Sequence, residues 1–358
     1  MVCRKGSGAV VTMSSEPRAG AAQSHMPTAR DLLDQGLVVS PSTLAEVREG
    51  LSGIGGAGSM RFIEIRMYGG LQFRLLPDRG LDVSSAWYGG IPLAWHSRVG
   101  ETPPLGVPRD QDWLKAFGGG IVATCGMQNV GASSEGHGLH GGFSHQVAHE
   151  LSWKRELRGN DLVIEVNGVV SEIDPLGVQL RCQRQITTMT GTPRMIIRDT
   201  VANLGAQPTP APWLYHVNIG APLWSGGAQL QIPSRARLPR DDASESASGN
   251  WSIQMLDTPD CAEMVLEHVF DEETPGRARV TNPGFGVELI IEWDRSTLPR
   301  LHQWLHRAQH VNVLAIEPAN CSVLGRNADR SAGRMPMLGP GEQRSTTLSI
   351  TAASVDME

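Results

Sequence analysis

The sequence lacks the features that identify several large classes of protein. Its five cysteines, an odd number, are scattered without CxxC spacing, which disfavours a disulfide framework or a zinc ribbon and favours free thiols in a reducing compartment. No apolar run reaches the ~20 residues needed to span a bilayer. The apolar patch near the N-terminus is also too short for a secretory signal. We therefore expect a cytoplasmic protein that does not enter the membrane.

Basic blocks are absent as well. The formal net charge of the 358 residues is -6, and charged residues make up 19% of the chain. This balance disfavours nucleic acid and anionic membrane surfaces as partners. A small neutral or mildly polar molecule fits it better, and a hydrophobic content of 40% is ample for a large core.

Several motifs of common enzymes are missing. There is no G-x-S-x-G elbow, and the glycines at 118–120 lack the spacing of a dinucleotide fingerprint. His149 lacks the second histidine that a zinc protease places four residues on. His302, His306 and His310 would line one face of a helix and suggest a metal, but LHQWLHR alternates as a strand does. We therefore expect no metal site, and a metal site formed by these histidines is the alternative.

Short apolar or alternating runs, separated by turn residues, make up most of the chain and predict antiparallel strands. No linker, internal repeat or convincing amphipathic helix interrupts them. The fold class is therefore all-β, an antiparallel sandwich of two stacked sheets in one domain at 29–358. The predicted strands are 60–67, 71–77, 81–88, 91–95, 150–157, 162–170, 178–188, 195–202, 213–219, 228–232, 263–269, 277–281, 286–293, 300–306, 311–316 and 343–352.

Four segments fall outside this pattern. Residues 1–28 are small and polar, and we expect a disordered extension. Residues 31–40 predict a short helix or lead-in, and 235–249 a long polar loop. Residues 43–51 are ambiguous, because their apolar spacing is helical but a glycine-rich, hairpin-like connection follows at once.

The glycine-rich stretch 118–145 organises the candidate site. Glycine lets a backbone approach a ligand closely, so Gln128, Asn129 and His140 among these glycines can face a cavity. The alternative is a surface loop with incidental histidines. In WLYHVNIGAP, strand alternation places His216 and Asn218 on one face, which fits a polar cavity, although a hydrogen-bonded core histidine is the alternative.

Glu317 follows the apolar run VNVLAI and precedes Pro318. A carboxylate there must be paired or solvated, because burying it alone is very costly. We expect Pro318 to stop the strand, so that Glu317 marks a rim; an ordinary glutamate facing water is the alternative. An imidazole and a carboxylate in one pocket make a general acid and a general base, which opening and closing a sugar ring requires.

LHGG at 139–142, His216 and the Glu317-Pro318 pair, in this order, resemble the aldose 1-epimerase (galactose mutarotase) superfamily. PDRGLDV at 77–83, TCGMQNVG at 124–131 and QWLHR at 303–307 are similar to a less characterised branch, often labelled aldose 1-epimerase-like. The resemblance extends from about residue 43 to residue 352.

The resemblance implies a galactose-mutarotase-like β-supersandwich that needs no metal or organic cofactor. It implies that Glu317 is the base at the O1 hydroxyl, that His216 is the acid at the ring oxygen, and that His140 holds the substrate and supports developing charge. We add candidate contacts to the sugar, with a turn-stabilising ion pair as the alternative for the first two: Arg79, Asp82, Gln128, Asn129, the stacking platform Trp304, and His302.

The sequence also departs from the superfamily. Val217 and Asn218 follow His216, where typical mutarotases have a proline and an aromatic residue. The arginines that clamp a phosphate in the hexose-6-phosphate branch are missing, which favours an unphosphorylated sugar. We expect an enzyme that interconverts sugar anomers. The alternatives are another sugar epimerase or isomerase acting next to a carbonyl, or a non-catalytic sugar-binding protein; the oligomeric state stays open, with a homodimer as one option.

Overall fold

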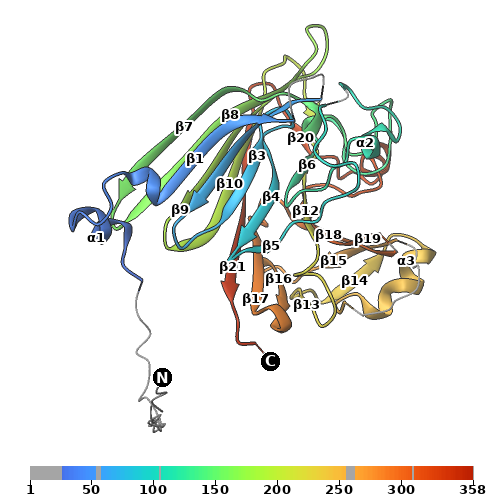
Figure 1. Ribbon diagram of the computed structural model, residues 1–358. Coiled ribbons are helices and arrows are strands. Elements are labelled where there is room, and N and C mark those ends of the chain that lie inside the picture. The colour runs from blue at the N-terminus through green and yellow to red at the C-terminus, as the bar shows by residue number, and fades with distance from the viewer. Residues whose placement is uncertain (1–25, 54–57, 105, 255–262, 309, 358) are drawn as a thin grey trace, which may run out of the picture.

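The computed structural model describes residues 26–53, 58–104, 106–254, 263–308 and 310–357 (Figure 1). Residues 1–25 of the expected extension lie outside the described ranges, but residues 26–28 lie within them. Thr28 is the N-cap of α1 (Ala29–Asp34): its side chain accepts from the backbone N–H of Asp31, whose carboxylate accepts from the N–H of Thr28. This capping box starts the expected short helix two residues early.

The largest sheet has eight antiparallel strands. Its core-facing residues alternate with more exposed ones, as the burial of β9 and β10 shows. In spatial order the strands are β13 (Gln229–Gln231), β16 (Gly276–Asn282), β17 (Val287–Trp293), β21 (Gln343–Ser354), β10 (Thr192–Asn203), β9 (Gln179–Met189), β8 (Asp161–Ile173) and β7 (His149–Arg158).

Three further antiparallel sheets complete the fold. The five-stranded sheet is β1 (Ala45–Ser52), β2 (Met60–Met67), β3 (Gln72–Leu76), β4 (Asp82–Tyr88) and β5 (Ile91–Pro92). The six-stranded sheet is β14 (Ala236–Pro239), β15 (Met264–Val269), β18 (Arg300–Ala308), β19 (Val311–Ala319), β12 (Leu214–Ile219) and β6 (Ala123–Cys125). The two-stranded sheet pairs β11 (Thr209–Pro210) with β20 (Met337–Leu338).

The remaining elements are short. They are α2 (Asp112–Lys115), α3 (Asp242–Ala247), α4 (Arg326–Ser331) and the 3₁₀ helices η1 (Pro41–Thr43), η2 (Phe143–His145), η3 (Ser248–Asn250) and η4 (Pro283–Phe285). Within the described ranges, no helix has the length and apolar character to cross a bilayer.

The main hydrophobic core draws on all three large sheets. The antiparallel all-β class is confirmed, but the described residues form three large sheets and one small one instead of the two expected. In Figure 1, β1, β3 and β4 lie over the β7–β10 half of the large sheet, and β14, β15, β18 and β19 lie beside β13, β16 and β17. The long twisted sheet is therefore covered by two shorter sheets rather than by one.

Two local predictions are corrected or resolved. The expected loop at 235–249 contains β14, α3 and η3. β14 is an edge strand and all four of its residues are exposed. It therefore lacks the alternation of apolar and polar residues from which a strand can be predicted. Asp241 caps α3 by accepting from the N–H of Ser244. The ambiguous segment 43–51 forms η1 and β1, which pairs with β2 in register.

The prediction that Pro318 ends its strand was wrong. β19 continues to Ala319, and Glu317 is buried rather than at a rim, with 3% of its surface exposed. Between β12 and β19 the ladder is paired at Leu214–Ala319 and at Val217–Ile316. Glu317 and Pro318 lie in the gap between these pairs. A proline, which has no N–H to donate, is tolerated where the ladder is already interrupted.

A buried arginine connects the three large sheets. Arg184, on β9 and with none of its side chain exposed, binds both carboxylate oxygens of Asp199 on β10 at 2.8–2.9 Å. It also donates to Asp82 on β4 and to the hydroxyl of Thr124 on β6, both at 2.8 Å. The Tyr215 hydroxyl on β12 donates to Asp199 at 2.6 Å. The network thus holds β12, the strand that carries His216, and its neighbour β6.

We predict that Arg184→Met destabilises the protein by about 3–5 kcal/mol, because it leaves two buried carboxylates without their partner. Denaturant unfolding measures this loss. Arg198→Met is the matched control, since Arg198 is exposed on the neighbouring strand, and it should change stability by less than about 0.5 kcal/mol. Equal losses in the two variants would show that the network does not hold the sheets together.

Candidate active site

A cavity of about 470 Å³ opens beside the six-stranded sheet and the glycine-rich stretch 118–145, here called the central loop. Its polar side chains come from segments that lie far apart in sequence, and most of the remainder are aromatic or aliphatic. The aromatic and charged side chains that line it, with the histidines, are Trp113, Phe117, His140, His216, Arg240, Glu263, Trp304 and Glu317. The volume is that of a small-molecule site.

His216 on β12 and Glu317 on β19 meet in this cavity. Nε2 of His216 lies 3.3 Å from Oε1 of Glu317, and 5% and 4% of their side chains are exposed. Burial raises the pKa of Glu317 to about 8, with a smaller lowering by Arg240 and a smaller increase from Glu263. Burial also lowers the pKa of His216 to about 4. Between these values the pair holds one proton that the two groups can share.

His140 is the third polar group, presented by a tight glycine-rich turn. Its own φ is 58°, and Gly141 follows with a φ of 73°. A Cβ on Gly141 would lie 2.4 Å from the carbonyl oxygen of Asn129, so only glycine fits. Nδ1 of His140 accepts from the N–H of Gly131 at 3.3 Å, which leaves the ring hydrogen on Nε2. Burial, then the nearby His216, lowers its pKa to about 3, so His140 is a neutral N–H donor.

Aromatic rings surround the His216 imidazole. The ring centroids of Phe117, Trp304 and His140 lie 5.3, 5.6 and 5.7 Å from it. Trp113 stacks on Phe117 with centroids 4.3 Å apart. These rings exclude water from the His216–Glu317 pair, and this desolvation is the physical cause of the two pKa shifts.

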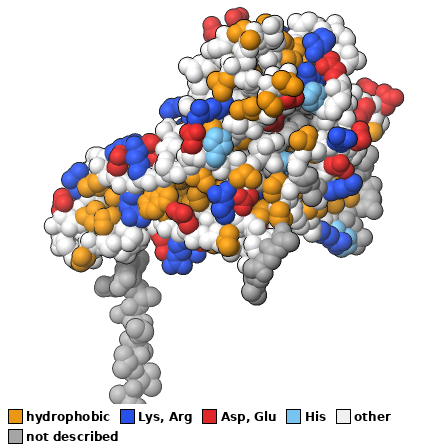
Figure 2. Space-filling model, turned by 90° about the horizontal axis from the view of Figure 1, so that it is seen from above, with side chains coloured by type: hydrophobic (Ala, Val, Ile, Leu, Met, Phe, Trp, Pro, Cys, Tyr) orange, Lys and Arg blue, Asp and Glu red, His pale blue; other side chains and the backbone are white. Residues whose placement is uncertain are grey.

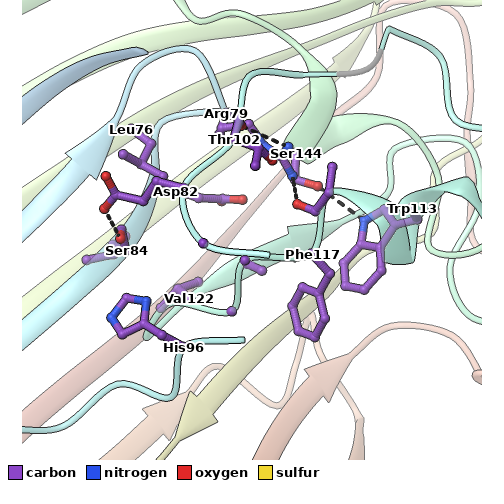
Figure 3. Close-up of a pocket in the computed structure, with 17 residues that line it drawn as sticks. Leu76, Arg79, Asp82, Ser84, His96, Thr102, Trp113, Phe117, Val122 and Ser144 are labelled. Atoms are coloured by element: carbon purple, nitrogen blue, oxygen red, sulfur yellow. Dashed lines mark hydrogen bonds between the residues drawn. The ribbon is translucent and has the colours of Figure 1, made fainter. Parts of the chain in front are cut away.

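The structure does not bring Arg79 and Asp82 into this cavity. Asp82 belongs to the Arg184 network, which replaces the turn ion pair considered above. Arg79 donates to the carbonyl oxygens of Ala116 and Thr102 and lines a separate cavity of about 30 Å³ (Figure 3). Trp113 and Phe117 line both cavities and so separate Arg79 from the main one. A turn residue can point into either space, and sequence cannot choose between them.

Of the other expected sugar contacts, one lines the main cavity and three do not. Trp304 lines the main cavity, and its indole N–H donates to Glu263 at 3.2 Å. His302 pairs with Glu317 in the strand register, but its Nε2 lies 3.1 Å from the carbonyl oxygen of Cys321 instead. Asn129 is buried and donates to two loop carbonyls, while the Gln128 side chain bonds Glu172. These last three side chains support the loop and strand rather than line the cavity.

Sequence reasoning missed Trp113, Phe117, Arg240 and Glu263. The aromatic pair has a usable signal, because the two residues stand four apart just before the glycine-rich loop. Arg240 follows the unpredicted strand β14 and is bonded to Glu263 and to Asp241 at 2.6–2.7 Å. No pattern at Arg240 distinguishes it from other surface arginines.

One face of the molecule, seen in Figure 2, carries charges of both signs. Figure 2 shows basic and acidic side chains interspersed, without a block of either. Across the described ranges, no three His, Cys, Asp or Glu side chains are arranged to hold a metal ion. The buried His216–Glu317 pair offers an acid and a base in an aromatic-walled pocket.

Comparisons with known proteins identify the family and the fold of the chain. A family profile described as a domain of unknown function (DUF4432) matches residues 57–352. A search of curated proteins finds no match. Among solved structures, a proposed aldose 1-epimerase from Klebsiella pneumoniae superposes with a TM-score of 0.79 at 22% identity, over 90% of this chain and 86% of that one.

Two more distant structures have the same fold. A galactose mutarotase-like protein from Clostridium acetobutylicum has a TM-score of 0.58 at 13% identity, over 87% of this chain and all of the other. Galactose 1-epimerase from Lactobacillus acidophilus has a TM-score of 0.55 at 12% identity, over 87% of this chain and 99% of that one. At these identities the likeness establishes the galactose-mutarotase-like fold.

We predict that Glu317→Gln stabilises the protein at high pH. The folded state holds the Glu317 proton up to about pH 8, whereas an ordinary glutamate releases it near 4.5, so this residue lowers stability as pH rises between those values. The variant should gain less than about 1 kcal/mol at pH 5 and about 4 kcal/mol at pH 8. Denaturant unfolding at both pH values measures this gain. Glu292→Gln, at an exposed glutamate, is the control, and a gain that does not grow with pH would contradict the buried, protonated state.

Proposed function

Because the chain belongs to the DUF4432 family and has a galactose-mutarotase-like fold, we propose that it is an isomerase of the aldose 1-epimerase type acting on an unphosphorylated sugar. The observation that carries the proposal is the buried His216–Glu317 pair inside a sugar-sized cavity. An imidazole and a carboxylate 3.3 Å apart and desolvated together suit a reaction that moves one proton between neighbouring oxygens.

The proposed reaction needs no proton from solvent. In the reactive form Glu317 is a carboxylate and His216 an imidazolium, which is reached when one proton moves from Oε1 to Nε2. Glu317 then takes the O1 proton of the sugar while His216 gives its proton to the ring oxygen, and the C1–O5 bond breaks. Rotation about C1–C2 presents the other face of the aldehyde. Reversal of both proton transfers closes the ring as the opposite anomer.

The neighbouring side chains have defined parts in this proposal. His140 offers its Nε2–H to the sugar oxygen on which negative charge develops. Trp113 and Trp304 supply apolar faces for the C–H side of the ring. Arg240 is the one lysine or arginine among the cavity residues, and two carboxylates already bind it. A phosphorylated sugar would therefore find no uncompensated cation in the described part of the cavity.

We predict that Glu317→Gln and His216→Asn each slow anomer exchange by roughly 10²–10⁴-fold. Exchange NMR over a panel of aldoses and ketoses measures the rate. Quenching of the cavity tryptophans reports binding, which should persist in both variants. Glu292→Gln is the matched control and should keep the wild-type rate. Full activity in Glu317→Gln would overturn the assignment of the base, while binding without exchange in the wild type would favour a non-catalytic sugar-binding protein.

We also predict a bell-shaped dependence of kcat/KM on pH. Below about pH 4 the pair takes up a second proton and loses its base, and above about pH 8 it loses its only proton and therefore its acid. The two limbs belong to the coupled pair. Anomer exchange measured from pH 3.5 to 9.5, corrected for the buffer-catalysed rate, should show both limbs; an enzymatic rate that keeps rising above pH 9 would contradict a shared proton.

A further inference from the structure

Asn218 lies two residues after His216 on the same face of β12, fully buried. Its amide nitrogen donates to the carbonyl oxygens of Gly120 and His216, at 2.9 and 3.0 Å. Because both hydrogens of that nitrogen are used, the orientation of the amide is fixed. The side-chain oxygen therefore points away from these carbonyls.

The oxygen of Asn218 and Nδ1 of His216 are both buried, and neither makes a hydrogen bond of full geometry to another described group. A buried polar atom without a partner costs about 1–3 kcal/mol, so two such atoms on one strand face are a strong reason to pair them. Asn218 is also the group whose hydrogen bond raises the pKa of His216 against the larger effect of burial.

We propose that Asn218 is a positioning residue that holds the hydrogen of neutral His216 on Nδ1, so that the bare Nε2 faces Glu317. The inference rests on the proposed function but concerns a residue that does not touch the reacting atoms. An amide oxygen can only accept, and an imidazole that donates from Nδ1 must accept at Nε2.

This arrangement lets the catalytic proton move without a change of tautomer. The proton passes from Oε1 of Glu317 to Nε2, 3.3 Å away, and the hydrogen on Nδ1 stays with Asn218 throughout. In the opposite tautomer Nε2 would already carry a hydrogen and could not receive one from Glu317. The other titratable group facing the imidazole, His140 on the central loop, is a neutral donor and cannot replace Asn218 as an acceptor.

The test is ¹⁵N NMR of histidine-labelled full-length protein at pH 7, with His216 assigned by its loss in His216→Gln. We expect the wild-type hydrogen on Nδ1. In Asn218→Leu, which removes the acceptor, it should move to Nε2, and kcat should fall about 10²-fold with KM little changed. Asn218→Asp keeps an acceptor, so the hydrogen should stay on Nδ1. Its negative charge should move the acid limb of the pH profile upward.

Asn203 supplies the matched control. It is fully buried on β10, outside the cavity, and its amide nitrogen also donates to two carbonyl oxygens. Asn203→Leu and Asn203→Asp should lose similar stability but leave the His216 tautomer and the acid limb unchanged. A wild-type hydrogen on Nε2, or an unchanged tautomer in Asn218→Leu, would overturn the inference. The spectrum needs no sugar, so it decides the role of Asn218 even if the protein proves inactive on every sugar.

Discussion

The geometry of the site depends on a single buried cation. Arg184 binds carboxylates on two different sheets and the hydroxyl of Thr124 on a third, and Asp199 in turn binds the residue next to His216. Its guanidinium also lies 4.8 Å over the ring of Phe143, three residues after His140. The planar, five-donor arginine suits such a junction better than lysine would, because each donor can address a different sheet. The positions of both cavity histidines are thus tied to one residue.

Desolvation determines the protonation states of the His216–Glu317 pair. The same aromatic enclosure disfavours charge on both side chains. Glu317 therefore becomes a weaker acid and His216 a weaker base, so the pKa of Glu317 lies above that of His216. A glutamate that would be ionised in water keeps its proton near neutral pH, and a histidine that would be partly charged stays neutral. The pair can then exchange one proton internally at little energetic cost.

Much of the fold and several of the residues that line the cavity could be predicted from the sequence. The predictions that were wrong or missing have physical causes. Alternation placed Leu214, His216 and Asn218 on one face, because a strand has period two whatever its neighbours are. The loop histidine and the tryptophan of QWLHR were found for similar local reasons. Arg79 was misplaced because Trp113 and Phe117, more than 25 residues later, decide which cavity it faces. Asp82 was misplaced because Arg184, on another sheet, binds it. Arg184 was missed because its role exists only where three sheets meet.

The error at Pro318 shows how tertiary context changes a local rule. Proline normally ends an interior strand because it cannot donate to the ladder. Here the β12–β19 ladder is open between Leu214–Ala319 and Val217–Ile316, and β18 still pairs with the proline from the other side. The same opening leaves His216 and Glu317 opposite each other with their side chains in contact. Pro318 is therefore compatible with a buried strand because it lies in the same interruption of the ladder that His216 and Glu317 occupy.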